Sequence, residues 1–403
     1  MEGNVEQNKR RRVVYVASET LAKVSSRLPS NKNRSLLVHA LVTSLGLTRS
    51  TESGASIAVL RPSPATQKDL AVYHDREYVQ FLLDPASAEG TEDMQSVEFG
   101  LEDDCPPFKG MREYVQAVAG ASLAAACALA EDQCDVAVCW DGGRHHAHKS
   151  HASGFCYVND CVLALLALKH APAPAPSRKP RIMYLDLDLH FCDAVAAAFH
   201  APASSSSSPP QVLTLSLHHA ARGFFPSSPL AMLSEPHTDP FTLALPLLAG
   251  ATNATFARVW TGVIERVRGA FDPDYVVVQC GCDGLAGDPC GVWNWAVGGE
   301  GGMGWCVTQV LGWGCKTLLL GGGGYNSPNA ARAWAYLTSV TRGDALALDT
   351  QIPDHGAFPL YAPSFTLDVP PGNVRDENTE EYLTHVEGVF EGVVQEIVDR
   401  LGR

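Results

Sequence analysis

Three ionisable side chains fall at alternate positions of one short apolar segment. Asp186, Asp188 and His190 stand at i, i+2 and i+4 in the run LDLDLH, where a buried strand is expected to end. Because side chains two residues apart in a strand point the same way, the three should converge at the carboxyl edge of a sheet. Two buried carboxylates are costly side by side unless a cation offsets their charge. The pattern predicts an open Zn²⁺ site or a site for a harder divalent ion, and the alternative is a helix cap or a loop salt bridge.

Three further strand ends carry groups suited to the same chemistry. His145 and His146 follow a Gly-Gly turn in the run WDGGRHH, where they either act as general base and acid on a metal-bound water or lie exposed in a loop. Asp283 follows the run VVVQCGC, and Tyr325 follows LLLGGGG, a glycine run without the Lys-Ser/Thr of a phosphate-binding loop. The four strand ends together would form one site with metal ligands, a base and a phenol.

The elements that position these groups alternate between short apolar runs and longer helical patterns. Strands are predicted at 13–17, 57–60, 135–140, 181–187, 212–217, 275–279 and 317–320, and helices at 33–47, 76–83, 111–130, 158–170, 252–269, 303–312, 327–340 and 378–401. This alternation indicates an α/β fold, with a parallel sheet covered by helices on both faces and ligands bound beyond the carboxyl ends of its strands. Two stretches rich in Pro, Ala and Ser, 171–180 and 201–210, are interpreted as surface loop insertions.

Composition places the chain among folded globular proteins. Its 403 residues are 46% hydrophobic and 18% charged, and Lys+Arg 30 against Asp+Glu 44 gives a net charge of −14. An acidic chain argues against direct nucleic-acid binding and suits cationic partners or basic peptide tails.

The cysteines and the start of the chain bear on the cellular compartment. The twelve cysteines are scattered, so we interpret them as reduced thiols, and neither a membrane span nor a signal peptide is expected. The basic residues at 9–12 form either a nuclear import signal or a solvated chain end.

Six ordered motifs resemble those of the zinc-dependent class I histone deacetylases. They are HHA at 145–147, GFCYVND at 154–160, DLDLH at 186–190, GFFP at 223–226, AGDP at 286–289 and GGGGYN at 321–326. The resemblance implies a catalytic domain at 13–365, followed at 366–403 by an extension with a docked helix. The short chain without a long tail looks most like the fungal Hos-type and vertebrate single-subunit members. The implied fold is the arginase/deacetylase fold, a single α/β domain with an eight-stranded parallel sheet and helices on both faces.

The resemblance implies a role for each motif residue. Asp188, His190 and Asp283 should hold one catalytic Zn²⁺ per chain, and Tyr325 should donate its hydroxyl to the substrate amide oxygen. The histidine pair should divide its work between a general base, His146 backed by Asp193, and a residue that tunes the charge of the site, His145 backed by Asp186.

Substrate and potassium contacts are implied in the same way. The substrate residues are Asp104 at the rim and Gly154, Phe155, Phe225 and Cys290 in the wall of an apolar tunnel for the acetyl-lysine stem. Arg34 matches an arginine of the internal cavity thought to release acetate. A structural K⁺ is implied at Asp186, Asp188, His190, Ser216 and Leu217.

The implied activity is hydrolysis of N6-acetyl-lysine in histones or other proteins to lysine and acetate, with a part in chromatin and transcription repression. Its expected partners are acetylated histone tails and a corepressor or chromatin complex, with no membrane, in the nucleus and also the cytoplasm. The alternatives are a weakened pseudo-deacetylase that binds acyl-lysine or scaffolds a complex, and a two-metal ureohydrolase or amidase on the same fold.

Three departures from the family pattern stand close to the catalytic residues. The chain has Phe191, Cys192 and Ala194 where relatives usually carry His, Gly and Gly around Asp193, and Arg144 where an apolar residue is common. The loop after Pro226 also lacks the family's Gly-Thr-Gly. Cys or Ala would strain the turn if either glycine position needs a positive φ. We expect instead that the backbone has adapted.

Overall fold

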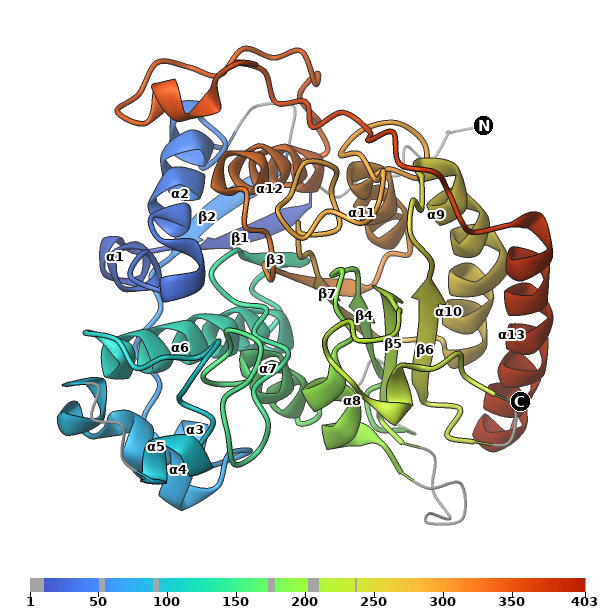
Figure 1. The fold of residues 1–403 in the computed structure, drawn as a ribbon, viewed down its shortest axis with the longest axis horizontal. Helices are drawn as coiled ribbons and strands as arrows, with labels where there is room; N and C mark the ends of the chain where they lie inside the picture. The colour runs from blue at the N-terminus through green and yellow to red at the C-terminus, as the bar shows by residue number, and fades with distance from the viewer. Residues whose placement is uncertain are drawn as a thin grey trace, which may run out of the picture.

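The computed structural model describes residues 11–50, 55–89, 94–172, 178–201, 210–235 and 238–402. Its strands are β1 Arg12–Val16, β2 Ser56–Leu60, β3 Val136–Cys139, β4 Ile182–Asp186, β5 Val212–His219, β6 Thr242–Leu247, β7 Tyr275–Gln279 and β8 Lys316–Leu320. They form one all-parallel sheet of eight strands in the order β2-β1-β3-β8-β7-β4-β5-β6 (Figure 1). The predicted α/β class and the eight-stranded parallel sheet are confirmed.

Helices cover both faces of this sheet. They are α1 Glu19–Ser25, α2 Arg34–Ser44, α3 Gln67–Leu70, α4 Arg76–Leu83, α5 Met94–Glu98, α6 Met111–Ala130, α7 Asp160–Leu168, α8 Asp193–Phe199, α9 Asn253–Val259, α10 Glu265–Phe271, α11 Met303–Gly312, α12 Ser327–Thr341 and α13 Glu380–Leu401. A π-helical turn, Trp260–Ile264, joins α9 to α10. One continuous helical run with this π turn in its middle therefore occupies the segment predicted as a helix at 252–269.

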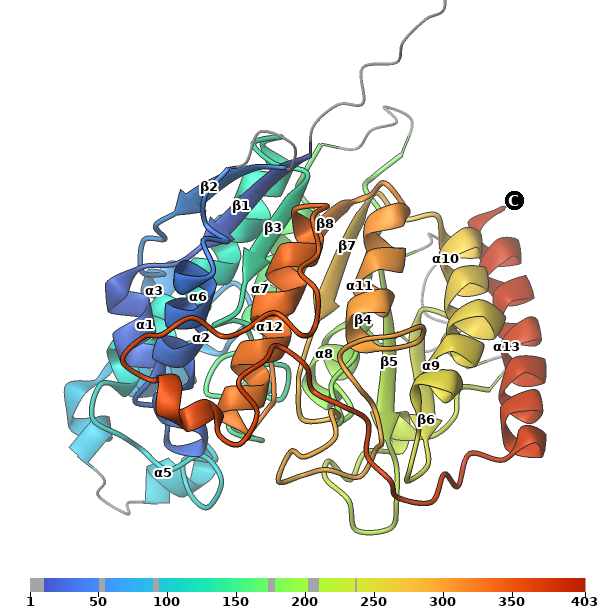
Figure 2. The same ribbon diagram turned by 90° about the horizontal axis from the view of Figure 1, so that it is seen from above.

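Alternating strand residues divide the core into two layers. Val13 and Tyr15 of β1 face the cluster shared with α2 and α9 to α13, whereas Val14 and Val16 face the cluster shared with α1, α4, α6, α7 and α8. Figure 1 shows the sheet between these two sets of helices, and in Figure 2 α11 and α12 lie in front of it. Because both faces are buried, the strands are almost continuously apolar, which is the pattern that the sequence carries.

The sequence patterns missed β6 and several short helices, among them α1 and α8. The segment of β6, TLALPL, contains Pro246, which lacks an N–H and so argues against a central strand. β6 lies at the edge of the sheet and pairs only with β5, where that donor is not needed. α1 and α8 have seven residues each, too few to show a clear helical period.

Two predictions fall partly outside the described residues. The low-complexity stretches are described only at 171–172, 178–180, 201 and 210, which lie between α7 and β4 and between α8 and β5. Of the basic cluster at 9–12, positions 9 and 10 are not described.

The apolar residues of helices α6 and α13 are largely buried inside the protein. α6 is long and apolar enough to cross a membrane by length and composition, but most of its apolar window is buried inside the protein, as in a core helix. Val386, Phe390, Val393 and Ile397 of the last helix, α13, are buried in the core. All twelve cysteines are free thiols.

Candidate active site

The four motif-bearing strands are direct neighbours at the centre of the sheet. Cys139, Leu320, Gln279 and Asp186 end β3, β8, β7 and β4, and each is paired in register with the next. The segments that follow these level strand ends therefore leave the sheet from one edge. This register brings together the side chains that the sequence placed at separate strand ends.

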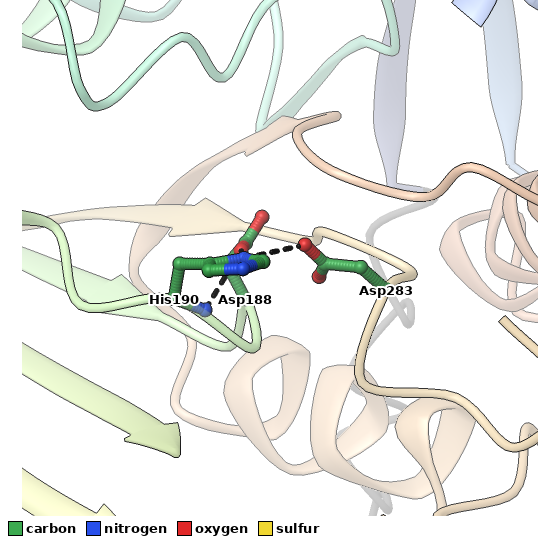
Figure 3. A group of neighbouring side chains, drawn as sticks. All are labelled: Asp188, His190 and Asp283. Carbon is green, nitrogen blue, oxygen red and sulfur yellow. Dashed lines mark hydrogen bonds and ion pairs between the residues drawn. The ribbon is translucent and has the colours of Figure 1, made fainter. Parts of the chain in front are cut away.

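Asp188, His190 and Asp283 form a compact buried cluster (Figure 3). The Nδ1 atom of His190 lies 2.9 Å from Oδ2 of Asp283 and 3.3 Å from Oδ1 of Asp188, and one ligand atom from each residue lies within 4.8 Å of the others. Ligands about 2.0–2.2 Å from a tetrahedral zinc stand roughly 3.3–3.6 Å apart. The spacing and the O, N, O donor set fit Zn²⁺.

The two buried carboxylates repel one another. Burial and the charge of Asp188 raise the pKa of Asp283 to about 7. Burial also opposes ionisation of Asp188, but His145 and His190 outweigh it and lower the pKa of that carboxyl. A divalent cation would favour both charged forms at once, so the donor set suits a metal ion.

Backbone and amide donors fix the orientation of Asp188. Its Oδ2 accepts the Gly323 N–H at 2.9 Å and the Gln279 amide at 2.8 Å. A Cβ at position 323 would stand 2.2 Å from Oδ2 of Asp283, so only glycine allows this loop to approach the carboxylates. The glycine run before Tyr325 therefore allows the backbone of this loop to lie close to the carboxylates of Asp188 and Asp283.

Each histidine of the pair has its own carboxylate partner. Nδ1 of His146 lies 2.7 Å from Oδ1 of Asp193, and Nδ1 of His145 lies 2.8 Å from Oδ2 of Asp186. In its neutral form each ring donates its Nδ1–H to the carboxylate and leaves Nε2 free to accept a proton. The two pairings predicted from the resemblance are present in the geometry.

The surroundings shift the pKa values of the two imidazoles in opposite directions. Burial and then the charge of His145 lower the pKa of His146 to about 4. Burial also disfavours the charged form of His145, but Asp186 and Asp188 outweigh it and raise its pKa to about 9. His146 is therefore the ring that is neutral and able to accept a proton at neutral pH, a division that marks acid and base roles in enzyme sites.

Aromatic rings surround the approach to the cluster. The Phe155 ring lies 5.5 Å from the Tyr325 ring, and the Phe225 ring lies 4.9 Å from the His146 ring, both in edge-to-face contact. Gly154 has a φ of +55°, and a Cβ there would stand 2.5 Å from the His146 ring. Oδ2 of Asp104 accepts the Gly154 N–H at 2.8 Å, which ties the predicted rim residue to the predicted wall.

The unusual turn after His190 contains no left-handed residue. Cys192 has φ −75° and ψ 57°, and Ala194 lies in the first turn of α8, outside the positive-φ positions. The contact between Asp193 and His146 is formed without backbone strain of that kind. The expected adaptation of the backbone agrees with this geometry.

Replacing Cys192 and Ala194 together by Gly is therefore expected to destabilise the protein without raising turnover. Each glycine adds about 0.5–1 kcal/mol of backbone entropy cost, and both side chains removed are buried. Denaturant unfolding and kcat/KM of the double variant would check this. A gain in turnover would show that the native turn is strained after all.

Several residues of the site were not singled out from the sequence. They are Gln279, which holds Asp188; His148, whose Nε2 lies 3.2 Å from Oδ2 of Asp193; Phe224, which stacks on His190; and Asp288, which accepts the backbone N–H groups of Tyr325 and Asn326. Gln279 and Asp288 lie in or beside the quoted strand-end motifs, so the rule that ligands gather at strand ends was a usable signal. Phe224 lies within the quoted GFFP motif and His148 directly follows the HHA motif, so the motifs were a usable signal for these two residues as well.

The remaining predicted residues lie around this centre. Ser216 is the register partner of Asp186 on β5 and precedes Leu217, and Cys290 donates its N–H to Asp288. Arg34 binds the carbonyl oxygens of Gly322 and Gly324 from within the fold.

An α/β sheet with a buried Asp-His-Asp cluster and carboxylate-backed histidines at one strand edge defines a metal-dependent hydrolase. Residues 28–341 match the model of the histone deacetylase domain. The chain is 36% identical to histone deacetylase 8 of Danio rerio over 98% of this chain and 99% of that protein. It is 34% identical to histone deacetylase RPD3 of Saccharomyces cerevisiae (89% and 77%) and 35% identical to human histone deacetylase 1 (89% and 69%).

The chain belongs to the class I histone deacetylase family. Its activity is that of a histone deacetylase, a hydrolase that acts on acetyl-lysine. The family implies a catalytic metal, for which the Asp-His-Asp cluster is the buried candidate among the described residues.

Proposed function

We propose that the chain hydrolyses N6-acetyl-lysine in histone tails or other proteins at a single zinc held by Asp188, His190 and Asp283. The observation that carries this proposal is the convergence of these three ligand atoms at the strand edge that also holds the His146–Asp193 pair. When bound, zinc supplies Lewis-acid chemistry, which polarises a carbonyl and lowers the pKa of water.

His146 accepts the proton of the attacking water in this proposal and later gives it to the departing lysine amine. Its Nδ1 is occupied by Asp193, so Nε2 is the atom that exchanges the proton. Asp193 keeps the ring in the required tautomer. His145, held by Asp186, contributes fixed positive charge beside the reaction centre.

The walls of the site select a neutral, extended side chain. Gly154, Phe155, Phe225 and Cys290 line the path of the lysine stem, and Asp104 holds the substrate backbone at the rim. Aromatic walls suit four methylenes and an amide better than a free ammonium group. This preference supports acylated over free lysine as the substrate.

Tyr325→Phe is expected to keep the metal and the fold but to lower kcat by roughly 10²–10³, because it removes one donor to the oxyanion. The phenyl ring preserves the contact with Phe155, so packing is nearly unchanged. Steady-state kinetics on an acetyl-lysine peptide, together with the zinc content of the variant, would check this. Wild-type turnover would remove Tyr325 from the mechanism.

The remaining assignments form part of the same proposal. Asp186, Asp188, His190, Ser216 and Leu217 would hold a structural K⁺. Residues 13–365 would form the catalytic domain, with 366–403 as its extension. The partners would be acetylated histone tails and a corepressor or chromatin complex, in the nucleus and also the cytoplasm. The net charge of −14 supports histone tails as partners, because these tails are basic.

Metal analysis of the purified protein, combined with acetate release from acetyl-lysine and longer acyl-lysine peptides, tests the proposal. One zinc per chain with acetate release supports it. Two equivalents of divalent ion that are both needed for activity would favour the ureohydrolase-like alternative. Acyl-peptide binding without acetate release would favour the weakened pseudo-deacetylase.

A further inference from the structure

A pocket opens to solvent next to the catalytic residues. It has a volume of about 420 Å³ and is lined by residues between His219 and Met232, in the loop that follows β5, together with Phe191. Arg222 and Met232 are exposed at its edge, which makes the pocket accessible from outside the protein. Pockets of roughly 300–1,000 Å³ are the size that binds small ligands, so this one has room for a large side chain.

The floor of this pocket is apolar. Phe191, Pro226 and Ala231 line it and are buried. At the edge, Met232 leaves 70% of its surface exposed. An exposed, flexible thioether beside an apolar floor is typical of surfaces that bind apolar side chains.

Two departures from the family pattern meet in this pocket. Phe191 stands where relatives usually carry His, and Ser227 and Ser228 follow Pro226 where the family has Gly-Thr-Gly. A histidine at position 191 would bring a titratable polar ring to the floor, whereas phenylalanine keeps the floor apolar. The apolar character of the pocket is therefore a property of this chain and not of the family motifs.

One aromatic ring separates the pocket from the metal ligands. Phe224, which lines the pocket, stacks on His190 with the ring centroids 5.1 Å apart and contacts the His219 ring at 4.7 Å. The next residue, Phe225, lies 6.1 Å from His190 and 4.9 Å from His146, and it is 39% exposed. An extended chain advances about 3.3 Å per residue, so a substrate that leaves the tunnel past Phe225 reaches the pocket within a few residues.

The charge at the edge of the pocket disfavours basic side chains. The Arg222 guanidinium forms no ion pair within 4.0 Å with any residue that the structure describes. None of the described residues that line the pocket carries a carboxylate. A Lys or Arg side chain placed there would be repelled by Arg222, whereas an apolar side chain would gain free energy from burial.

We propose that this pocket is a specificity subsite of the deacetylase, which takes an apolar side chain of the substrate protein within a few residues of the acetyl-lysine. The inference rests on the proposed function, because it requires acetyl-lysine to enter past Phe225. The subsite selects among acetylated lysines by the residue nearby. It disfavours a basic residue at that one position, although the net charge of −14 attracts basic segments to the protein as a whole.

A set of otherwise identical acetyl-lysine peptides tests the proposal. Each of the three positions on either side of the acetyl-lysine carries Leu, Ala or Lys in turn. Acetate release gives kcat and KM for each peptide, and fluorescence anisotropy gives its Kd. At one position we expect Leu to exceed Ala in kcat/KM by about tenfold, through KM and not kcat, which is the usual effect of a few methylenes in an apolar pocket. Lys at that position should fall below Ala.

Two variants show whether the preference arises in this pocket. The phenyl ring of Ala220→Phe fills part of it, and Met232→Ser removes its apolar edge, so both should lower the ratio of the Leu to the Ala peptide towards one. Arg222→Met should bring the Lys peptide closer to the Ala peptide. The matched control is Leu360→Ser, which changes a similarly exposed apolar side chain outside the pocket and should keep the wild-type ratios.

The outcomes separate the subsite from the activity itself. A preference for Leu at one position that Ala220→Phe removes supports the subsite. Equal kcat/KM for Leu and Ala at every position, or a preference that Ala220→Phe and Met232→Ser both retain in full, overturns it. If Ala220→Phe does not fold, Met232→Ser decides alone.

Acetate release from none of the peptides would instead contradict the proposed function. The subsite is then judged from Kd alone. Tighter binding of a Leu peptide that the variants weaken would support it, and equal Kd values for Leu and Ala would overturn it too.

Discussion

Asp283→Ala is expected to abolish metal binding and turnover while leaving the fold intact. The substitution reduces the buried three-residue cluster to one carboxylate and one imidazole. Changing a mere hydrogen-bonding partner of a metal ligand costs about 10–100-fold in affinity, so loss of a ligand should cost at least about 100-fold. Zinc content after gel filtration, chelator competition and kcat/KM on an acetyl-lysine peptide would measure both effects.

The matched control for this variant is Asp344→Ala. Asp344 is an exposed aspartate outside the site and should keep metal and activity. The rise of the unfolding midpoint on adding zinc provides a second reading, expected in wild type and in Asp344→Ala but lost in Asp283→Ala. An Asp283→Ala protein that still holds one tightly bound zinc would show that Asp283 is not a ligand.

His146→Ala is expected to lower kcat/KM by about 10²–10⁴ without loss of metal, which is the usual contribution of a positioned acid or base. Its partner is Asp193, and it is not part of the Asp-His-Asp cluster. Because burial and His145 lower the pKa of His146 to about 4, the ring stays neutral as the pH falls through the ordinary histidine range. The acid limb of the wild-type pH–rate profile should therefore lie below pH 6.5.

His148→Ala separates the role of the base from that of its support. His148 also touches Asp193, at 3.2 Å, but its side chain is partly exposed. We expect its loss to change kcat/KM only slightly. An equal loss in the two variants would indicate that orientation of Asp193, and not proton transfer by His146, limits the reaction.

The sequence alone could identify the chemistry because that information is local. The period of two in LDLDLH places three side chains on one face of a strand, whatever the rest of the chain does. The apolar runs of β3, β4, β7 and β8 are signals within a few residues, and they predict buried parallel strands. The missed strand β6 shows the limit of this reasoning, since Pro246 is acceptable only where the tertiary structure makes the strand an edge.

Only the tertiary structure decided which groups meet. Nothing within a strand specifies that β3, β8, β7 and β4 are neighbours with their ends in one row, because strand order depends on how helices pack on both faces. The same holds for Arg144, whose type suggests a solvated side chain but whose guanidinium is enclosed beside Arg34. Periodicity acts over a few residues, whereas pairing, burial and pKa depend on residues far apart in sequence that the sheet and its helices bring together.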